Sequence, residues 1–168
     1  QLIKDMAKAL VQELTPDIKD SYQWGDNQEE RILALYNRVP LMSMVSGITK
    51  DPQALYIFDK LYTKNGITNT ADDWHYLADP FSTKTAPSGR MTHNASGMGM
   101  AFYHEGWNVN DSFFASTMSN PTKVDHDWET LSNFNLYRSG HWAITNPRGY
   151  YGSKVDAPYM NSMMISGG

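Results

Sequence analysis

Apolar positions recur at helical spacing at the start of the chain. Ile3, Met6, Leu10 and Leu14 repeat with a period close to that of an α-helix. This pattern predicts an amphipathic helix over residues 2–14.

Two further helices are predicted by the same pattern and by their end signals. Apolar positions over 28–39 predict one helix, which Pro40 is expected to bend or end. Asp51 followed by Pro52 is typical of a helix start, with the aspartate as N-cap and the proline at the first helical position. An Asn-Gly pair at 65–66 then predicts the end of that helix.

The second half of the chain has a different pattern. After residue 80, Gly, Pro, Ser and Asn become frequent and the helical period fades. Residues 98–103 and 107–117 are expected to form strands or short helices, and strands are expected at 143–145 and within 150–165. Helices first and strands later favour an α+β fold, with an antiparallel sheet covered by helices.

Composition narrows the class of protein. The 168 residues suit one domain, and 14 basic against 18 acidic side chains leave a net charge of −4. That balance argues against a nucleic-acid binder, and no apolar run reaches the roughly 20 residues that cross a bilayer. The absence of cysteine excludes disulfides, cysteine-ligated zinc and cysteine nucleophiles. A surface rich in Asn, Ser, Thr and Tyr favours an extracellular protein.

Chemically active residues concentrate in one part of the chain. Asp125-His126-Asp127-Trp128-Glu129 is followed by Ser139-Gly140-His141-Trp142. Imidazole and carboxylate groups together can bind zinc or another divalent ion, or act as general acid and base. The alternative is that this acidic run is a solvated loop, and that His104-Glu105 is an exposed pair at a strand end.

Four segments resemble the CAP superfamily, which groups cysteine-rich secretory, antigen five and pathogenesis-related one proteins. Residues 81–90 are similar to its FSHxxPxG segment, and 104–109 to its GENI-type element. Residues 132–147 resemble the bacterial form SNxxxxGHRRWxLNP, and 31–47 the opening helix. The resemblance implies an α-β-α sandwich with an antiparallel sheet flanked by helices. It implies a CAP-like domain over 28–168, with an N-terminal helix and linker over 1–27.

The same resemblance implies a cavity with two histidines and two glutamates that holds a divalent metal. His141 matches the second family histidine, and Thr83 stands where the first belongs. Glu105 matches the first glutamate, and Glu129 is the candidate for the second. The predicted cavity residues are therefore His141, Glu105, Glu129 and Thr83. The predicted ligands for a possible zinc ion are His141, Glu105 and His126.

These expectations lead to three functional hypotheses. The first is a non-enzymatic CAP-like module of a bacterial secreted or cell-wall protein, which binds a partner protein, a cell-surface ligand, a small molecule or a metal. The second is a metal-assisted hydrolase of cell-wall or other extracellular polymers that uses His141 with Glu105 or Glu129. The third is an unrelated α+β domain in which the motif match is accidental.

Overall fold

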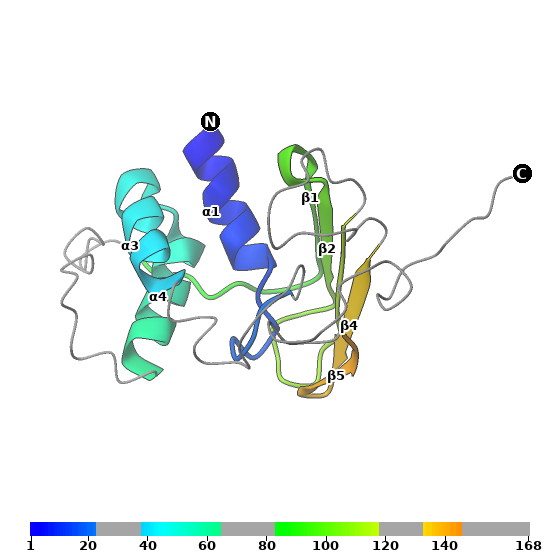
Figure 1. The fold of residues 1–168 in the computed structure, drawn as a ribbon. Coiled ribbons are helices and arrows are strands. Elements are labelled where there is room, and N and C mark those ends of the chain that lie inside the picture. The colour runs from blue at the N-terminus through cyan, green and yellow to red at the C-terminus, as the bar shows by residue number, and fades with distance from the viewer. Residues whose placement is uncertain (23–37, 65–82, 118–132, 146–168) are drawn as a thin grey trace, which may run out of the picture. The chain divides into compact units, whose positions relative to one another are not determined.

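A computed structural model describes residues 1–22, 38–64, 83–117 and 133–145 of the chain (Figure 1). The chain divides into two compact units, which are treated one by one. The helical unit comprises Gln1–Leu14, Ile18–Ser21 and Glu30–Ser88. The sheet unit comprises Thr15–Asp17, Tyr22–Glu29 and Gly89–Gly168.

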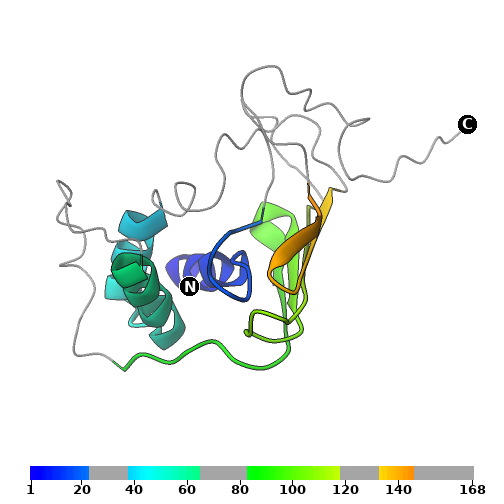
Figure 2. The same ribbon diagram turned by 90° about the horizontal axis from the view of Figure 1, so that it is seen from below.

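Three helices that pack against one another form the described part of the helical unit (Figure 2). They are α1 (Leu2–Gln12), α3 (Arg38–Thr49) and α4 (Pro52–Lys64). Their contact is apolar, with fully buried side chains from all three helices: Ala7, Val11, Met42, Val45, Leu55, Ile57 and Leu61. None of the helices in the described ranges is long and apolar enough to span a membrane.

The predicted start of α4 is confirmed at atomic detail. The Asp51 carboxylate oxygen Oδ1 accepts hydrogen bonds from the backbone N–H groups of Gln53 at 2.9 Å and Ala54 at 3.0 Å. Asp51 therefore satisfies two N–H groups that the first helical turn leaves without a helical acceptor. Pro52 follows as the first helical residue, where its missing N–H has no cost.

Pro40 was expected to bend or end a helix, and an end at this residue is wrong, because α3 runs from Arg38 to Thr49 and contains it. Pro40 lies in the first turn of α3, where a backbone N–H has no helical acceptor. A proline at that position therefore removes no hydrogen bond. The expected helix over 28–39 lies mostly outside the described residues.

In the described part of the sheet unit, five antiparallel strands form one sheet in which each strand pairs with its neighbour in sequence. They are β1 (Met91–Ala95), β2 (Met100–His104), β3 (Phe113–Thr117), β4 (Phe134–Arg138) and β5 (His141–Ile144). A short 3₁₀ turn, η2 (Ser96–Met98), joins β1 to β2.

The sheet confirms the α+β class and the antiparallel pairing expected from the sequence. The α-β-α sandwich stays a prediction, because the helices and the sheet belong to separate units. Strands were expected near β2, β3 and β5, whereas β1 and β4 were not anticipated. The strands expected within 150–165 lie outside the described residues.

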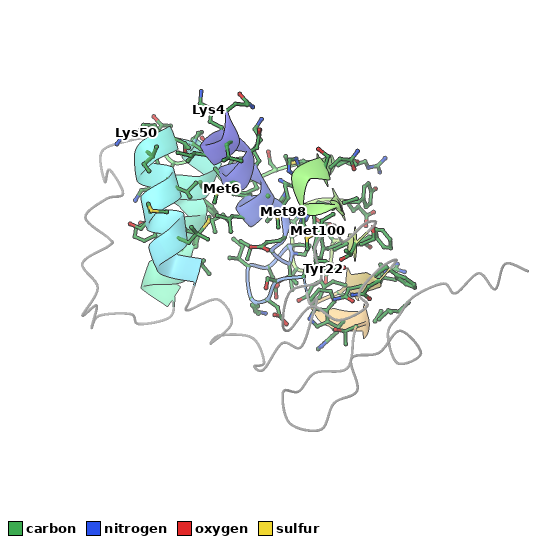
Figure 3. All side chains as sticks on the ribbon, turned by 45° about the horizontal axis from the view of Figure 1, so that its top comes forward. Lys4, Met6, Tyr22, Lys50, Met98 and Met100 are labelled. Atoms are coloured by element: carbon green, nitrogen blue, oxygen red, sulfur yellow. The ribbon has the colours of Figure 1, made fainter. Side chains whose placement is uncertain are left out.

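One face of the sheet is buried around Tyr22. The Tyr22 ring meets Phe102 edge-on, with 6.0 Å between ring centroids, and its hydroxyl lies 2.7 Å from Thr117 Oγ1. The other buried members of this cluster are Met100, Phe113, Ala115 and Tyr137. Figure 3 labels Tyr22 and Met100. The cluster joins the segment around residue 22 to strands that follow 78 to 115 residues later in sequence.

Candidate functional site

The predicted cavity residues lie in different parts of the chain. His141 begins β5 and Glu105 follows β2, and both are exposed in the sheet unit. Thr83 is exposed in the segment that precedes the sheet and belongs to the helical unit. His126 and Glu129 lie outside the described residues.

Glu105 has a local role at the start of the β2–β3 loop. Its carboxylate Oε2 accepts a hydrogen bond from the Ser112 backbone N–H at 3.2 Å, and its own N–H donates to the Ser112 carbonyl at 2.9 Å. Glu105 therefore closes the loop that spans residues 105–112.

The sheet order separates Glu105 from His141. Because β3 and β4 lie between their strands, the two residues are three strand spacings apart, or roughly 14 Å. Two ligands of one zinc ion each lie only about 2 Å from the metal. Among the residues that the structure describes, no group of three His, Cys, Asp or Glu is placed to hold a metal ion. The zinc site with His126 stays a prediction.

The structure instead brings Arg138 and His141 together at the β4–β5 hairpin. Ser139 and Gly140 form the turn, with φ angles of 51° and 81°. Positive φ at both central positions is the geometry of a type I′ turn, which matches the twist of antiparallel strands. The turn places Arg138 directly opposite His141 in the register. Directly opposite residues project from the same face of a sheet.

Aromatic packing holds this hairpin in place. The Trp142 ring meets the Tyr137 ring edge-on at 5.1 Å and contacts the Phe113 ring at 6.2 Å between centroids. Tyr137 and Trp142 are adjacent to Arg138 and His141, respectively, on the opposite, buried face. Arg138 and His141 thus project from two strands that are held in place by aromatic packing on their opposite face.

The same packing extends to His104, which the sequence analysis expected to be exposed. Its imidazole is fully buried, stacked on Trp107 with centroids 4.2 Å apart and tilted against Phe113 at 4.6 Å. The expected exposure of His104 is wrong because consecutive residues at the end of β2 point to opposite faces of the sheet. His104 faces the core and Glu105 faces solvent.

The acidic side chains of the neighbouring loop are occupied by local hydrogen bonds. Asp111 Oδ2 accepts from the Asn108 backbone N–H at 2.7 Å and from Asn108 Nδ2 at 3.0 Å. Glu105 accepts from Ser112, as described above. This loop lies beside the hairpin, since a Cβ at Gly140 would be 3.5 Å from Val109 Cγ2.

Arg138 and His141 are both exposed, and within the described ranges neither side chain forms an ion pair or a hydrogen bond. Sequence reasoning singled out His141 but missed Arg138. The available signal was the Ser-Gly pair between the two strands, which marks a turn or loop. Where such a pair forms a two-residue hairpin, the residues on either side lie opposite each other.

Comparison with known proteins finds likeness in structure only. No family model matches the sequence, and no curated protein does. The heparan sulfate lyase HepC from Pedobacter heparinus superposes with a TM-score of 0.58 at 17% identity, over 93% of this chain and 20% of that chain. The heparinase III BT4657 gene product superposes with a TM-score of 0.57 at 11% identity, over 89% of this chain and 20% of that chain. At these identities the likeness concerns the fold, and this chain spans about a fifth of the matched chains.

The resemblance to the CAP superfamily is wrong. The structures similar to this chain are heparan sulfate lyases, and no family model supports the motif match. The part of the 132–147 match that the structure describes is a β-hairpin, and 104–109 is the end of a strand with its loop. Hairpins and strand ends of this kind are common in antiparallel sheets, so these two segments do not by themselves distinguish one fold from another.

Proposed function

We propose that this chain is part of a polysaccharide lyase that acts on an acidic polysaccharide. The observation that carries the proposal is the structural likeness to two heparan sulfate lyases over about nine tenths of the chain. Because one fold can serve several functions, the proposal also needs a site with suitable chemistry.

The Arg138–His141 pair supplies chemistry that suits an acidic polymer. Guanidinium groups bind carboxylate and sulfate oxygens through charge-assisted hydrogen bonds. The chain as a whole carries a net charge of −4, so its overall field does not attract a polyanion. Binding must therefore depend on local groups, and this exposed pair is such a group.

The test is to incubate the protein with heparan sulfate and follow the ultraviolet absorbance of the products. A lyase breaks the glycosidic bond by elimination and leaves a carbon–carbon double bond conjugated to a carboxylate, which absorbs ultraviolet light. The natural full-length protein is used, since the matched lyases are about five times longer than the part this chain covers. We expect absorbance to rise with the release of shorter chains.

The products also separate the lyase from the hydrolase considered in the sequence analysis. Hydrolysis releases new reducing ends without the ultraviolet band, and this result would refute the lyase proposal. Heat-denatured protein serves as the control.

A second candidate is a binding module without catalysis, located outside the cell. The exposed basic pair favours it, because recognition of a charged ligand requires no catalytic group. Its ligand would be an extracellular polymer rather than a nucleic acid, in keeping with the acidic net charge. Binding of heparan sulfate without any change in chain length would support this candidate over the lyase.

A further inference from the structure

We propose that Arg138 and His141 form an oxyanion-binding subsite that takes a sulfate or carboxylate group of an acidic polysaccharide. The choice of a polysaccharide rests on the proposed function. The subsite itself rests on the geometry of the β4–β5 hairpin.

The turn sets the spacing of the two groups. Residues that flank a two-residue turn have Cα atoms about 5.5 Å apart when they exchange backbone hydrogen bonds. Arg138 and His141 occupy these flanking positions and project from one face. Both side chains are long enough to reach a single tetrahedral or planar oxyanion placed between them.

The energetics favour an anion at this position. A shared anion makes an attractive contact with each side chain, a charge-assisted one with the Arg138 guanidinium and an N–H hydrogen bond with the His141 imidazole. When the planar guanidinium of Arg138 is aligned with an oxyanion, it can donate two parallel N–H···O hydrogen bonds. An imidazole N–H of His141 can donate a third hydrogen bond.

In the ranges that the structure describes, no carboxylate pairs with Arg138 or His141. Of the nearby loop carboxylates, Glu105 accepts from the Ser112 backbone N–H, and Asp111 accepts from Asn108. Arg138 and His141 have no hydrogen-bonding or ion-pair partner in the described part of the chain. An oxyanion bound between the two side chains would supply a counter-charge for the pair.

The backbone of the site is already held in its binding arrangement. Trp142 packs edge-on against Tyr137 behind the pair, and the I′ turn fixes the strand register. Little backbone ordering is then required when the anion binds, which removes one of the main costs of association.

Titration calorimetry with a heparan sulfate hexasaccharide tests the subsite. Arg138→Gln and His141→Gln each remove one proposed contact. Arg90→Gln is the matched control, because Arg90 is an exposed arginine of the same unit outside the hairpin. We expect Arg138→Gln to weaken binding about tenfold, the usual effect of losing a charge-assisted hydrogen bond. Arg90→Gln is expected to change the affinity less than about twofold.

Conservative variants and modified ligands add detail. Arg138→Lys keeps the positive charge but loses the planar guanidinium that can donate two parallel hydrogen bonds. The affinity of this variant for the hexasaccharide is therefore expected to lie between those of the wild type and Arg138→Gln. Carboxyl-reduced and desulfated hexasaccharides identify which oxyanion is bound, since only one of the two changes is expected to reproduce the loss seen for Arg138→Gln. Circular dichroism of each variant verifies that the sheet remains folded.

Several outcomes would overturn the subsite. Equal losses for Arg138→Gln and Arg90→Gln would show that binding depends on overall charge alone. An absence of hexasaccharide binding by the wild type would also refute it.

The lyase proposal fails or holds separately. Binding that depends on Arg138, without ultraviolet-absorbing products, would support the subsite and refute the lyase. Lyase activity that is unchanged in Arg138→Gln would support the lyase and refute the subsite.

Discussion

Tyr22 illustrates how much a single residue contributes to the sheet unit. Its side chain is fully buried, and its hydroxyl shares a hydrogen bond with Thr117, which is 95 residues away in sequence. Asn133, 111 residues away, lies within 3.5 Å of the same hydroxyl through Nδ2. A lone tyrosine has no pattern around it that predicts such contacts, so sequence reasoning did not identify it.

Removing this hydroxyl is expected to destabilise the protein. Tyr22→Phe keeps the ring against Phe102 and leaves Thr117 Oγ1 buried without this partner. We expect a loss of about 1–3 kcal/mol in the free energy of unfolding, measured by urea denaturation.

The matched control for this variant is Tyr56→Phe in α4, where the ring is half-buried beneath Lys60. No side-chain hydrogen bond of Tyr56 occurs in the described part of the chain. We expect this control to change stability by less than about 0.5 kcal/mol. Equal effects of the two variants would show that the hydrogen bond of the Tyr22 hydroxyl does not contribute to the free energy of unfolding.

At the scale of elements, local signals work well where a helix begins with its own cap. Asp51 and Pro52 are adjacent in sequence to the backbone groups they serve, so the start of α4 was predictable. The β4–β5 hairpin is equally local, but its signal is a Ser-Gly pair, which also occurs in many loops. The opposition of Arg138 and His141 became evident only with the register.

Loss of the Asp51 cap is expected to weaken α4. Asp51→Ala removes the acceptor for two backbone N–H groups and is expected to lower stability by about 1 kcal/mol, as judged by chemical denaturation. Asp51→Asn keeps an oxygen acceptor and is expected to restore most of the loss. If the asparagine variant were as unstable as the alanine variant, the carboxylate charge rather than the cap bond would be responsible.

Strain in the hairpin turn is expected from Gly140→Ala. Gly140 has a φ of 81°, a conformation that costs a residue with a Cβ about 1–2 kcal/mol. Thermal unfolding of this variant is compared with that of Gly97→Ala, because a Cβ at Gly97 meets nothing within 4 Å. We expect the control to be neutral. A neutral Gly140→Ala would contradict the type I′ turn.

At the scale of the whole molecule, the class of fold was predictable, whereas the resemblance to the CAP superfamily was wrong. Helical periods in the first half and strand-like runs in the second half led to an α+β fold, which the helices and the antiparallel sheet confirm. The CAP resemblance failed because its motifs coincide with ordinary hairpins and loops. Likeness to the heparan sulfate lyases appears only in three dimensions, since identity is 11–17%.

The sequence by itself determined what depends on neighbours within about one helical turn. This covers the existence of α1 and the capped start of α4, although the expected apolar stripe of α1 is not its buried face, since Ile3 and Met6 are exposed. Composition also excluded cysteine chemistry and gave the net charge. Only the tertiary structure decided which distant residues meet. It placed Tyr22 against Thr117, buried His104, separated Glu105 from His141 and set Arg138 opposite His141. The reason is that strand pairing and register arise from contacts across the sheet, and a pattern read along one strand does not specify its partner.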